Sequence, residues 1–558
     1  MGEYIRLKRS NCKNCYKCIR NCPVKSISFK DQQANIVPEE CILCGRCFVA
    51  CPQNAKEVRN DLPAAKAILA TGAPVYASLA PSFVACWEGV TIASLDRALR
   101  RLGFTAAEET AVGATIVKEE YARIVAAGEQ EAVVSSCCHA VNTLIQKRFP
   151  ECLPYLAKVL SPMQAHCKDL KRRHPGARCI FIGPCIAKKA EAEDYPGIVD
   201  CVLTFEELSA WLAEEGVPLE PMADGNAESK ARLFPTTGGI LRTMTEKDPG
   251  YAYLAVDGIE NCITALQDLA AGKMGRCFIE MSACAGSCIG GPAMGKNRRA
   301  AVRDYVAVDR YAGPWDFPVE QPEPERLKKR FPMLCAEGVK PGAAAIEEVL
   351  RRMGKTRPEH ELNCGSCGYD TCRDKAVAVL AGKADIDMCL PYLKEKAESF
   401  SDQIIQNTPN AILALDGSLK VQQLNGAACR LMGLRSPAEA LGKNVDAILD
   451  PQPFCDALNN GVTVHEKTLW LGQYEKYVDQ IVSYDKNSDI LVCVMRDITD
   501  EERQRSEREA MSLATMEITD KIIEKQMRTV QEIASLLGET TAETKVALTK
   551  LKESLGHE

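Results

Sequence analysis

Residues 12–23 read CKNCYKCIRNCP, and residues 41–52 read CILCGRCFVACP. Both follow the pattern C-x2-C-x2-C-x3-C-P, so the second is an internal repeat of the first. In this pattern three thiolates hold one 4Fe–4S cluster, and the cysteine before the proline reaches across to the other cluster. Zinc is the alternative, but the doubled run and both prolines favour two clusters. The predicted ligands are Cys12, Cys15, Cys18 and Cys51 for the first cluster, and Cys41, Cys44, Cys47 and Cys22 for the second.

The composition excludes several broad classes of protein. The 558 residues are enough for roughly three to five domains. A formal charge of −6 argues against nucleic acid as a main partner, which needs a basic face. No stretch approaches the roughly 18 apolar residues of a membrane span, and the opening MGEYIRLKRSNC lacks the apolar core of a secretory signal. The 28 cysteines are therefore expected to bind metal in an anaerobic cytoplasm rather than to form disulfides.

A third cysteine set lies far downstream. Residues 364–389 follow C-x2-C-x4-C-x16-C, with Pro391 close behind. The stretch AVAVLAGKAD (376–385) is typical of a helix, which would fold the last cysteine back toward the first three. Four thiolates at this spacing suit one 4Fe–4S cluster or zinc, and the other cluster runs favour the cluster. The predicted ligands are Cys364, Cys367, Cys372 and Cys389.

Between these sets, from about residue 63 to residue 309, β-type runs alternate with helical stretches. The predicted helices include SLDRALRRLGF (94–104) and TFEELSAWLAEEG (204–216). Three of the predicted strands end on a loop that carries cysteine. Because ligands collect at the carboxyl ends of strands in α/β sheets, these loops are predicted to converge on one site. The predicted strands are PVYASLA (74–80), EAVVSSCC (131–138), RCIFIGPC (178–185) and RCFIEMSAC (276–284).

The three cysteine loops carry a family resemblance. They read SSCCHA (135–140), GPCIAKKAE (183–191) and EMSACAGSCIGG (280–291). In order and spacing they resemble the signature loops of the iron–iron (FeFe) hydrogenases, which are TSCCP, MPCxxKxxE and ExMxCxxxCxxGG. The resemblance implies a two-lobed α/β H-domain, in a multidomain α/β and α+β chain that begins with a ferredoxin-like domain. It extends to the flanking stretches SPMQAHCKDL (161–170), VDCVLTFEEL (199–208) and TTGGI (236–240).

The resemblance also implies the active cofactor of that family, the H-cluster. This group joins a 4Fe–4S cubane to a diiron subsite that carries carbon monoxide, cyanide and an azadithiolate. A cubane requires four thiolates, and one of them would bridge to the diiron subsite. The implied cubane ligands are Cys138, Cys185, Cys284 and the bridging Cys288.

Three more residues match catalytic positions of the family. Lys188 would donate a charge-assisted hydrogen bond to a cyanide, and Glu191 would orient Lys188. Alone, this stretch would be interpreted as a solvated helix face. Cys137 matches the cysteine that relays protons to the diiron subsite, a task that suits a thiol with an ordinary pKa of about 8.5. The alternative for Cys137 is a buried structural thiol.

The sequence departs from the family pattern around the implied site. Gly183 and Ser282 stand where the family has methionine, which removes thioether bulk and changes polarity near the subsite. His139 replaces a proline, and either hydrogen-bonds near the cluster or faces solvent. Glu120 can be matched to the first carboxylate of the outer proton path, but the next one falls at Arg123. These departures predict low turnover with the clusters still bound.

The C-terminal third resembles a signalling region. The stretch GPWDFPVEQPEPERLKKR (313–330) is typical of a linker. Residues 404–434 resemble the opening of a PAS domain, with a hairpin turn at Asp416–Gly417, and residues 489–499 resemble its last strand. No haem ligand is evident, and Cys429 lacks the context of a flavin-photoadduct cysteine. The PAS ligand is therefore unknown, and the domain is either empty or a dimerisation surface.

The chain ends in a predicted helical tail. Apolar residues spaced by three and four predict a coiled-coil seam, with a helix packed on its own PAS domain as the alternative. Gly538 is expected to end this helix. No kinase, cyclase or phosphatase motif follows, so an output enzyme would be a separate chain. The seam residues are Met516, Ile523, Met527, Val530, Ala534 and Leu537.

This domain order resembles the sensory group of FeFe hydrogenases. The favoured function is a dihydrogen sensor of low turnover that relays redox state to the PAS domain. The alternatives are a catalytic hydrogenase with a regulatory PAS domain, and a non-enzymatic scaffold for iron–sulfur assembly. The expected partners are dihydrogen, a ferredoxin-like electron carrier, a separate kinase or phosphatase, and a second copy of the chain, with no nucleic acid or membrane. The predicted domains are 1–60 (ferredoxin-like, two 4Fe–4S clusters), 61–312 (H-cluster domain), 313–345 (linker), 346–400 (single 4Fe–4S cluster), 401–500 (PAS) and 501–558 (helical signalling or dimerisation tail).

Overall fold

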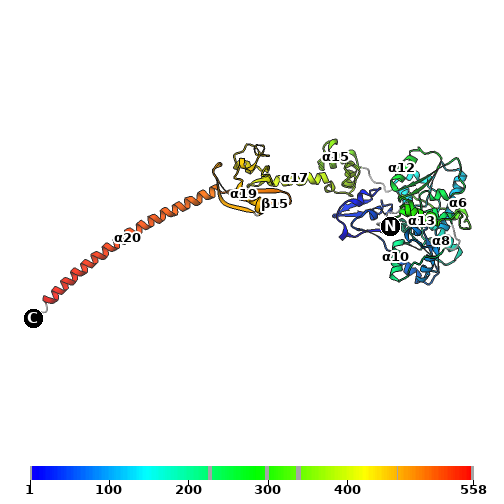
Figure 1. Ribbon diagram of the computed structural model, residues 1–558, viewed down its shortest axis with the longest axis horizontal. Coiled ribbons are helices and arrows are strands. Elements are labelled where there is room, and N and C mark those ends of the chain that lie inside the picture. Colours follow the sequence, from blue (N-terminus) through cyan, green and yellow to red (C-terminus); the bar gives the residue numbers. More distant parts are fainter. Residues whose placement is uncertain (1–2, 224–228, 296–300, 335–340, 462, 555–558) are drawn as a thin grey trace. The chain divides into compact units, whose positions relative to one another are not determined.

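The computed structural model describes residues 3–223, 229–295, 301–334, 341–461 and 463–554. The chain forms two compact units, residues 1–393 and residues 394–558. Figure 1 traces the chain from its first strands in blue to helix α20 in red. Among the described residues, no helix is both long enough and apolar enough to cross a membrane.

The N-terminal region is built around the two cysteine runs. The first run contains the short helix α1 (Lys17–Arg20), and the second contains α2 (Arg46–Ala50). Ile19, Ile27 and Phe48 are buried in one core, which holds the two runs together. Two antiparallel strand pairs complete the region: β1 (Ile5–Leu7) with β4 (Lys56–Val58), and β2 (Ile27–Lys30) with β3 (Gln33–Ile36).

Two separate parallel sheets form the next region, as the alternating pattern predicts. Their central strands are apolar because helices cover both faces of a parallel sheet. Parallel register brings the carboxyl ends of neighbouring strands to one edge, where Leu79 lies beside Glu109 and Ile182. One sheet has the order β6 (Ala106–Glu109), β5 (Val75–Leu79), β8 (Arg178–Gly183), β9 (Cys201–Thr204), and the other has the order β10 (Ala252–Asp257), β11 (Cys277–Ser282), β7 (Ala132–Val134).

Helices connect these strands and fix the loops between them. Helix α8 begins behind a capping box formed by Ser161 and Gln164, and α10 begins behind one formed by Thr204 and Glu207. The helices predicted over 94–104 and 204–216 are confirmed as α5 and α10. The helices of this region are α3 (Leu62–Leu69), α4 (Phe83–Cys86), α5 (Ile92–Arg101), α6 (Ala111–Ala127), α7 (His139–Arg148), α8 (Pro162–Arg173), α9 (Ala187–Asp194), α10 (Phe205–Glu214), α11 (Gly239–Thr243), α12 (Ile259–Ala270) and α13 (Ala301–Tyr311).

The stretch predicted as a linker, residues 313–345, is packed over residues 313–334. Its helix α14 (Pro324–Leu327) ends on Leu327, which is buried in the core beside β7 and β11. The Leu327 carbonyl accepts a hydrogen bond from the Leu160 N–H at 2.8 Å, and the Lys329 N–H donates to the Lys158 carbonyl at 2.9 Å. A linker therefore does not describe residues 313–334, because an apolar anchor and backbone hydrogen bonds hold them in place. Residues 335–340 lie outside the described residues.

The region with the third cysteine set is small and helical. Helix α15 (Ala343–Arg352) packs on α16 (Cys372–Leu380), so the helix predicted over residues 376–385 is confirmed as far as Leu380. The chain reverses at Gly382, whose φ of +66° lies in the left-handed region that favours glycine. Helix α17 (Leu390–Asn407) follows directly after Cys389. The fourth cysteine therefore lies at the start of the helix that leads out of this region.

The second unit begins within helix α17, and an antiparallel sheet follows this helix. Its strand order is β13 (Val421–Leu424), β12 (Ala411–Asp416), β16 (Ile490–Asp497), β15 (Lys476–Asp485), β14 (Val464–Leu471). The predicted hairpin at Asp416–Gly417 is confirmed by the pairing of β12 with β13. Leu413, Phe454 and Cys493 lie in the core, to which helices α18 (Gly426–Leu431) and α19 (Gln452–Asn460) contribute.

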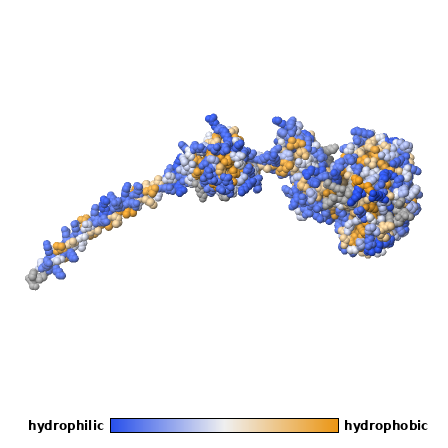
Figure 2. Space-filling model, viewed as in Figure 1, coloured by the Kyte–Doolittle hydropathy of each residue, from blue (hydrophilic) through white to orange (hydrophobic). Residues whose placement is uncertain are grey.

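Helix α20 (Thr499–Ser554) continues for 56 residues without a break. The predicted end at Gly538 is wrong, because one glycine costs a helix only about 1 kcal/mol relative to alanine and its neighbours Leu536, Leu537 and Glu539 are good helix formers. All described residues from 503 to 554 are exposed. Figure 2 shows hydrophobic side chains in orange along this exposed helix.

Candidate active site

Three strands deliver the cysteine loops to one place. Strand β7 leads to Cys138, which is the N-cap of α7, and β8 leads to Cys185, just before α9. Strand β11 leads to Cys284, and the short helical turn after Gly286 carries Cys288. The cysteine loops after β7, β8 and β11 thus lie together, in agreement with the prediction that the carboxyl ends of these strands converge.

Four thiols lie together at this point. Burial raises the pKa of Cys185 to about 11, and the nearby Cys138 raises it further. Burial also raises the pKa of Cys288 to about 12, with Cys185 and Cys138 as further causes. Burial also raises the pKa of Cys284 well above its ordinary value, and the neighbouring Cys185, Cys138 and Cys288 raise it further. Thiols that are buried and crowded resist ionisation unless positive charge compensates, and the irons of a cubane supply such charge. The donor set therefore fits a 4Fe–4S cubane.

A cavity of about 100 Å³ lies beside these thiols. Its wall contains the thiols of Cys137, Cys138, Cys185 and Cys288. Most of the remaining wall is apolar, so a group bound here would be shielded from water. The apolar wall residues include Ala80, Pro81, Met163, Phe181, Phe234, Pro235, Ile240 and Met281, and the polar ones are Ser82, Thr110, Lys188, Glu280, Ser282 and Ser287.

An ion triad fixes Lys188, the one lysine among the described residues of the cavity wall. Lys188 Nζ donates to the Cys137 carbonyl at 3.0 Å and forms an ion pair with Glu191, which is fully buried. On its other side Glu191 pairs with the buried Lys329, whose Nζ also donates to the Gln164 side chain at 2.8 Å. Burial opposes the charge on Lys188, but Glu191 raises the pKa of Lys188 overall. Lys188 and Lys329 hold the pKa of Glu191 well below its usual range despite burial.

The comparison with known families identifies this region. Residues 73–292 match the family model described as the iron only hydrogenase large subunit, C-terminal domain. These residues are an iron-only hydrogenase domain. Residues 4–52 match a 4Fe–4S dicluster domain, residues 361–391 match the FeS model, whose description names an Fe–S cluster, and residues 399–457 match the PAS fold. The predicted FeFe hydrogenase resemblance, ferredoxin-like domain and PAS domain are thereby confirmed.

The chain is also similar to several individual proteins. The chain is 25% identical over 365 residues to the periplasmic [Fe] hydrogenase large subunit of Nitratidesulfovibrio vulgaris, which covers 52% of this chain and 86% of that protein. It is 30% identical over 127 residues to the cytosolic Fe-S cluster assembly factor NAR1 of Kluyveromyces lactis, which covers 22% of this chain and 27% of that protein. Among solved structures, [FeFe]-hydrogenase HydA1 from Chlamydomonas reinhardtii matches with a TM-score of 0.41 and 20% identity, covering 50% of this chain and 100% of that chain.

In the hydrogenase domain, Cys137 contacts a residue that the sequence did not single out. Its Sγ lies 3.2 Å from the hydroxyl of Tyr121, which also accepts the Ser136 N–H at 2.9 Å. Burial raises the pKa of Cys137 to about 12, although the hydrogen bond with Tyr121 lowers it. The predicted residue, Glu120, pairs with Arg123 instead, at 2.6 Å. Successive residues of a helix point about 100° apart, so Tyr121 and Glu120 face different surroundings.

Glu280 is the carboxylate that lines the cavity. It is 3% exposed, and the Leu241 N–H donates to it at 3.1 Å. Burial raises the pKa of Glu280 to about 7, while the backbone N–H groups of residues 238–241 lower it. The only sequence signal for Glu280 is the first position of the motif ExMxC.

The residues that depart from the family pattern have distinct surroundings. His139 is buried, with its Nε2 3.3 Å from a carboxylate oxygen of Asp194, so the solvent-facing alternative for His139 is wrong. Ser282 lies in the cavity wall. A Cβ on Gly183 would lie 2.7 Å from the ring of Phe181, which also lines the cavity. Phe181 therefore fills space beside the position where the family has methionine.

In the dicluster domain the two cysteine runs exchange their last members. Burial raises the pKa of Cys18 to about 11, and its cysteine neighbours are Cys12, Cys15 and Cys51. Burial raises the pKa of Cys44 to about 12, and its neighbours are Cys22 and Cys41. Cys47 has the neighbours Cys44, Cys41 and Cys22. The cysteines thus fall into the same two groups that the repeat predicts, and their role as cluster ligands stays a prediction. Cys44 is also a neighbour of Cys284, so the second cysteine set lies beside the hydrogenase domain.

The third cysteine set surrounds a buried lysine. Lys375 is 1% exposed, and its Nζ donates to the Ile386 carbonyl at 2.9 Å. Burial lowers the pKa of Lys375, and Cys367, Cys389 and Cys372 raise it. Cys364 in turn is a neighbour of Cys367. Within the described residues, no group of three or more His, Cys, Asp or Glu side chains is arranged to hold a single metal ion. A 4Fe–4S cubane differs from a single ion in that it takes one cysteine on each of its four irons.

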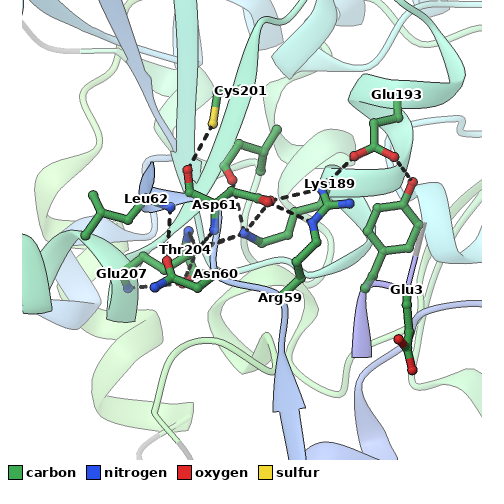
Figure 3. Close-up of polar contacts among 12 residues, drawn as sticks. Glu3, Arg59, Asn60, Asp61, Leu62, Lys189, Glu193, Cys201, Thr204 and Glu207 are labelled. Atoms are coloured by element: carbon green, nitrogen blue, oxygen red, sulfur yellow. Dashed lines mark hydrogen bonds and ion pairs between the residues drawn. The ribbon is translucent and has the colours of Figure 1, made fainter. Parts of the chain in front are cut away.

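A second ion network joins helix α9 and Glu207 of the hydrogenase domain to residues 59–61, which follow strand β4 (Figure 3). Lys189 Nζ, which is fully buried, pairs with Asp61 and Glu207 at 2.9 Å each. Asp61 also pairs with Arg59 at 2.7 Å, and Arg59 pairs with Glu193 at 2.6 Å. Lys189 and Glu193 both lie on α9, the helix that begins beside Cys185. Their ion pairs with Asp61 and Arg59 therefore anchor this helix to the N-terminal part of the chain.

Proposed function

We propose that this chain is a sensory iron–iron hydrogenase, which binds dihydrogen at an H-cluster, interconverts it slowly with protons and electrons, and relays redox state to its PAS domain. The observation that carries the proposal is the meeting of four thiols from three loops beside a buried cavity, where Lys188 is held by a buried carboxylate. Iron–sulfur regions on both sides and a PAS domain on the same chain support the sensory role.

The proposed cofactors are three 4Fe–4S clusters and the H-cluster. Each set of four cysteines that the structure groups together is assigned one cluster. Cys288 is also assigned the bridge to the diiron subsite. The sets are Cys12, Cys15, Cys18 and Cys51; Cys41, Cys44, Cys47 and Cys22; Cys364, Cys367, Cys372 and Cys389; and Cys138, Cys185, Cys284 and Cys288.

When bound, the diiron subsite supplies the heterolytic cleavage of dihydrogen. The chain's own residues prepare its pocket. Lys188 carries a positive charge at the cavity wall and is placed to donate to a cyanide, and Glu191 holds Lys188 there. Cys137 holds a proton at Sγ beside the Tyr121 hydroxyl, and Glu280 adds a second protonatable group to the same wall. The apolar wall excludes water from these groups.

Slow turnover follows from the state of Glu120. Its carboxylate is bound by two nitrogens of the Arg123 guanidinium, at 2.9 Å and 2.6 Å. The guanidinium engages both carboxylate oxygens, so neither oxygen is left free to take up a relayed proton. The outer proton path of the family is therefore interrupted here, as suits a sensor more than a high-turnover enzyme.

Infrared spectroscopy tests this function. Anaerobic protein loaded with the diiron subsite is compared under nitrogen and under dihydrogen, and its turnover is measured with an artificial electron carrier. Carbon monoxide and cyanide bands that shift under dihydrogen, together with low turnover, are the expected result. High turnover would favour the catalytic alternative. Absence of the bands in protein with full cubane iron would favour the scaffold alternative and overturn the proposal.

Cys137→Ala is expected to slow proton exchange at the diiron subsite by about 100-fold or more, because general acid–base groups contribute at least that much. The cubane should stay bound, since Cys137 is not one of its four proposed ligands. Hydrogen–deuterium exchange and iron content measure the two effects. Cys455→Ala, in the PAS region, is the matched control. Unchanged exchange in Cys137→Ala would remove this thiol from the mechanism.

Helix α20 is proposed to pair with a second copy of itself. Met516, Ile523, Val530 and Leu537 recur every seven residues and are each more than half exposed. A helix of 56 residues is about 84 Å long at 1.5 Å per residue, and long helices gain most of their stability from packing an apolar face. The described side chains from 503 to 554 do not pack on the PAS domain, which favours the coiled coil over the intramolecular alternative.

Val530→Asp combined with Leu537→Asp is expected to convert a dimer into a monomer, because four charges would be buried in the seam of the pair. Sedimentation of the full chain measures the change. Val546→Asp is the matched control, since residue 546 lies on the opposite face of the same heptad register and is 56% exposed. A wild-type monomer, or a double variant that stays dimeric, would exclude this seam as the contact.

A further inference from the structure

The single-cluster region at residues 361–391 packs directly on the dicluster domain. The Arg20 guanidinium donates to the Ser366 carbonyl at 2.8 Å, and Lys25 Nζ donates to the Gly368 carbonyl at 2.9 Å. The Phe29 N–H, on strand β2, donates to the Lys383 carbonyl at 2.7 Å. Backbone carbonyls of the single-cluster region thus accept hydrogen bonds from several points of the dicluster domain, which defines one specific contact.

Gly368 lies at the closest approach of the two regions. Its φ is +97°, and a Cβ on it would lie 2.7 Å from the Ile19 side chain. Ile19 is part of α1, and in the chain it lies between Cys18 of the first cysteine set and Cys22 of the second. Only glycine allows the chain to approach this closely, so the contact places the single-cluster region against the stretch that connects both sets.

Tyr369, the next residue, is buried in this contact with its hydroxyl unpaired. It is 3% exposed, and the hydroxyl has no hydrogen-bond partner among the described residues. An unpaired buried hydroxyl costs about 1–3 kcal/mol. Cys367, Glu40 and Cys22 are the charged or ionisable neighbours of the Tyr369 phenol. Cys367 belongs to the third cysteine set and Cys22 to the second, so Tyr369 lies between two proposed clusters.

We propose that the Tyr369 hydroxyl donates a hydrogen bond to a sulfur of the cluster held by Cys22, and that the Gly368–Tyr369 contact is the electron path from that cluster to the one held by Cys364, Cys367, Cys372 and Cys389. The proposal rests on the ligand sets assigned under the proposed function. It explains both the unpaired hydroxyl and the close approach at Gly368. Electrons from the hydrogenase domain would then reach the single-cluster region through the dicluster domain.

The step along this path is a one-electron transfer. One electron leaves the reduced cluster held by Cys22 and reduces the cluster of the single-cluster region, and no proton or atom moves. A hydrogen bond to a cluster sulfur stabilises the more negative, reduced state and so raises the reduction potential. Tyr369 would therefore set the potential of the donor cluster while it holds the two regions together.

Tyr369→Phe tests the hydrogen bond, because it removes only the hydroxyl oxygen. The full chain is reconstituted with iron and sulfide without oxygen, and a redox titration is followed by electron paramagnetic resonance. One cluster of the dicluster domain is expected to move to a more negative potential. The control Tyr484→Phe makes the same change in the second unit and should leave every potential unchanged. Unaltered potentials in Tyr369→Phe, with full iron content, would overturn the inference.

Gly368→Ala tests the path separately. The added methyl group would push the single-cluster region away from Ile19, so the magnetic interaction between its reduced cluster and the dicluster domain is expected to weaken. An unchanged interaction would exclude this contact as the path. Cys364→Ala distinguishes a wrong electron path from a wrong cluster assignment. If the assignment is right, this variant should lose about four irons per chain. If it loses none, the cluster assignment itself is wrong, and the inference is overturned with it.

Discussion

Lys188→Ala is expected to lose the diiron subsite while the cubane stays bound. Loss of a residue that supports a metal group typically lowers its affinity by about 10–100-fold. Lys188 is the one lysine in the described cavity wall, and its Nζ is already fixed by the Cys137 carbonyl and Glu191. Removing it takes away the positive charge that would face a cyanide. The intensity of the carbon monoxide and cyanide infrared bands, relative to total iron, measures the loss.

The control for this experiment is Lys273→Ala in the same domain. Lys273 is 70% exposed and pairs only with a surface aspartate, Asp268, so its loss should leave the bands at full intensity. A Lys188→Ala protein with full bands would refute the cyanide-binding role. If both the bands and the cubane iron disappear, Lys188 supports the fold of the site rather than the diiron subsite alone.

Glu191→Gln is expected to destabilise the hydrogenase domain by about 3–5 kcal/mol, the range for removing one partner of a buried ion pair. Glu191 is fully buried and is the shared partner of Lys329, which is also fully buried, and of Lys188, whose side chain is 12% exposed. The amide would leave both ammonium groups without a counter-charge. Denaturant unfolding of the protein, followed by tryptophan fluorescence, measures the change.

The sign of the pH effect in this triad follows from Glu191. Lys188 and Lys329 hold its pKa far below the ordinary value, so its ionised form stabilises the fold above the unfolded pKa. That stability is lost only as the pH falls toward the folded pKa, and Glu191→Gln should remove this acid-side dependence. The control Glu260→Gln, at a residue 63% exposed and paired with Arg46, should change stability by less than about 1 kcal/mol. Equal effects of the two substitutions would contradict the role of the buried triad.

The cysteine sets and the strands that carry them could be predicted from the sequence because their causes are local. Three ligands of a ferredoxin-type cluster share one loop, so Cys12, Cys15 and Cys18 stand three residues apart. Strand β8 is an apolar run that ends on a cysteine, and the geometry of parallel sheets predicts where such an end points. The grouping of Cys185 with Cys284 therefore followed from a general rule together with the family resemblance.

The contacts that support the site could not be predicted, because they depend on residues distant in the chain. Lys329 pairs with Glu191 across 138 residues and lies in a charged run that has the composition of a linker. Tyr121 faces Cys137 while Glu120 does not, a difference of one position on a helix whose other residues are mostly apolar. Tyr369 stands two residues after Cys367 in a loop, and only the packing of two separate regions reveals its unpaired hydroxyl.

Helix α9 has little freedom to change during evolution or engineering. In only eight residues it carries Lys189 and Glu193, which hold the N-terminal side, and Glu191, which holds the segment at Lys329, next to Lys188 in the cavity wall. Inserting or deleting one residue would turn everything beyond it by about 100°. All of these pairings would then fail together, so α9 is expected to tolerate substitutions on its exposed positions but no change of length.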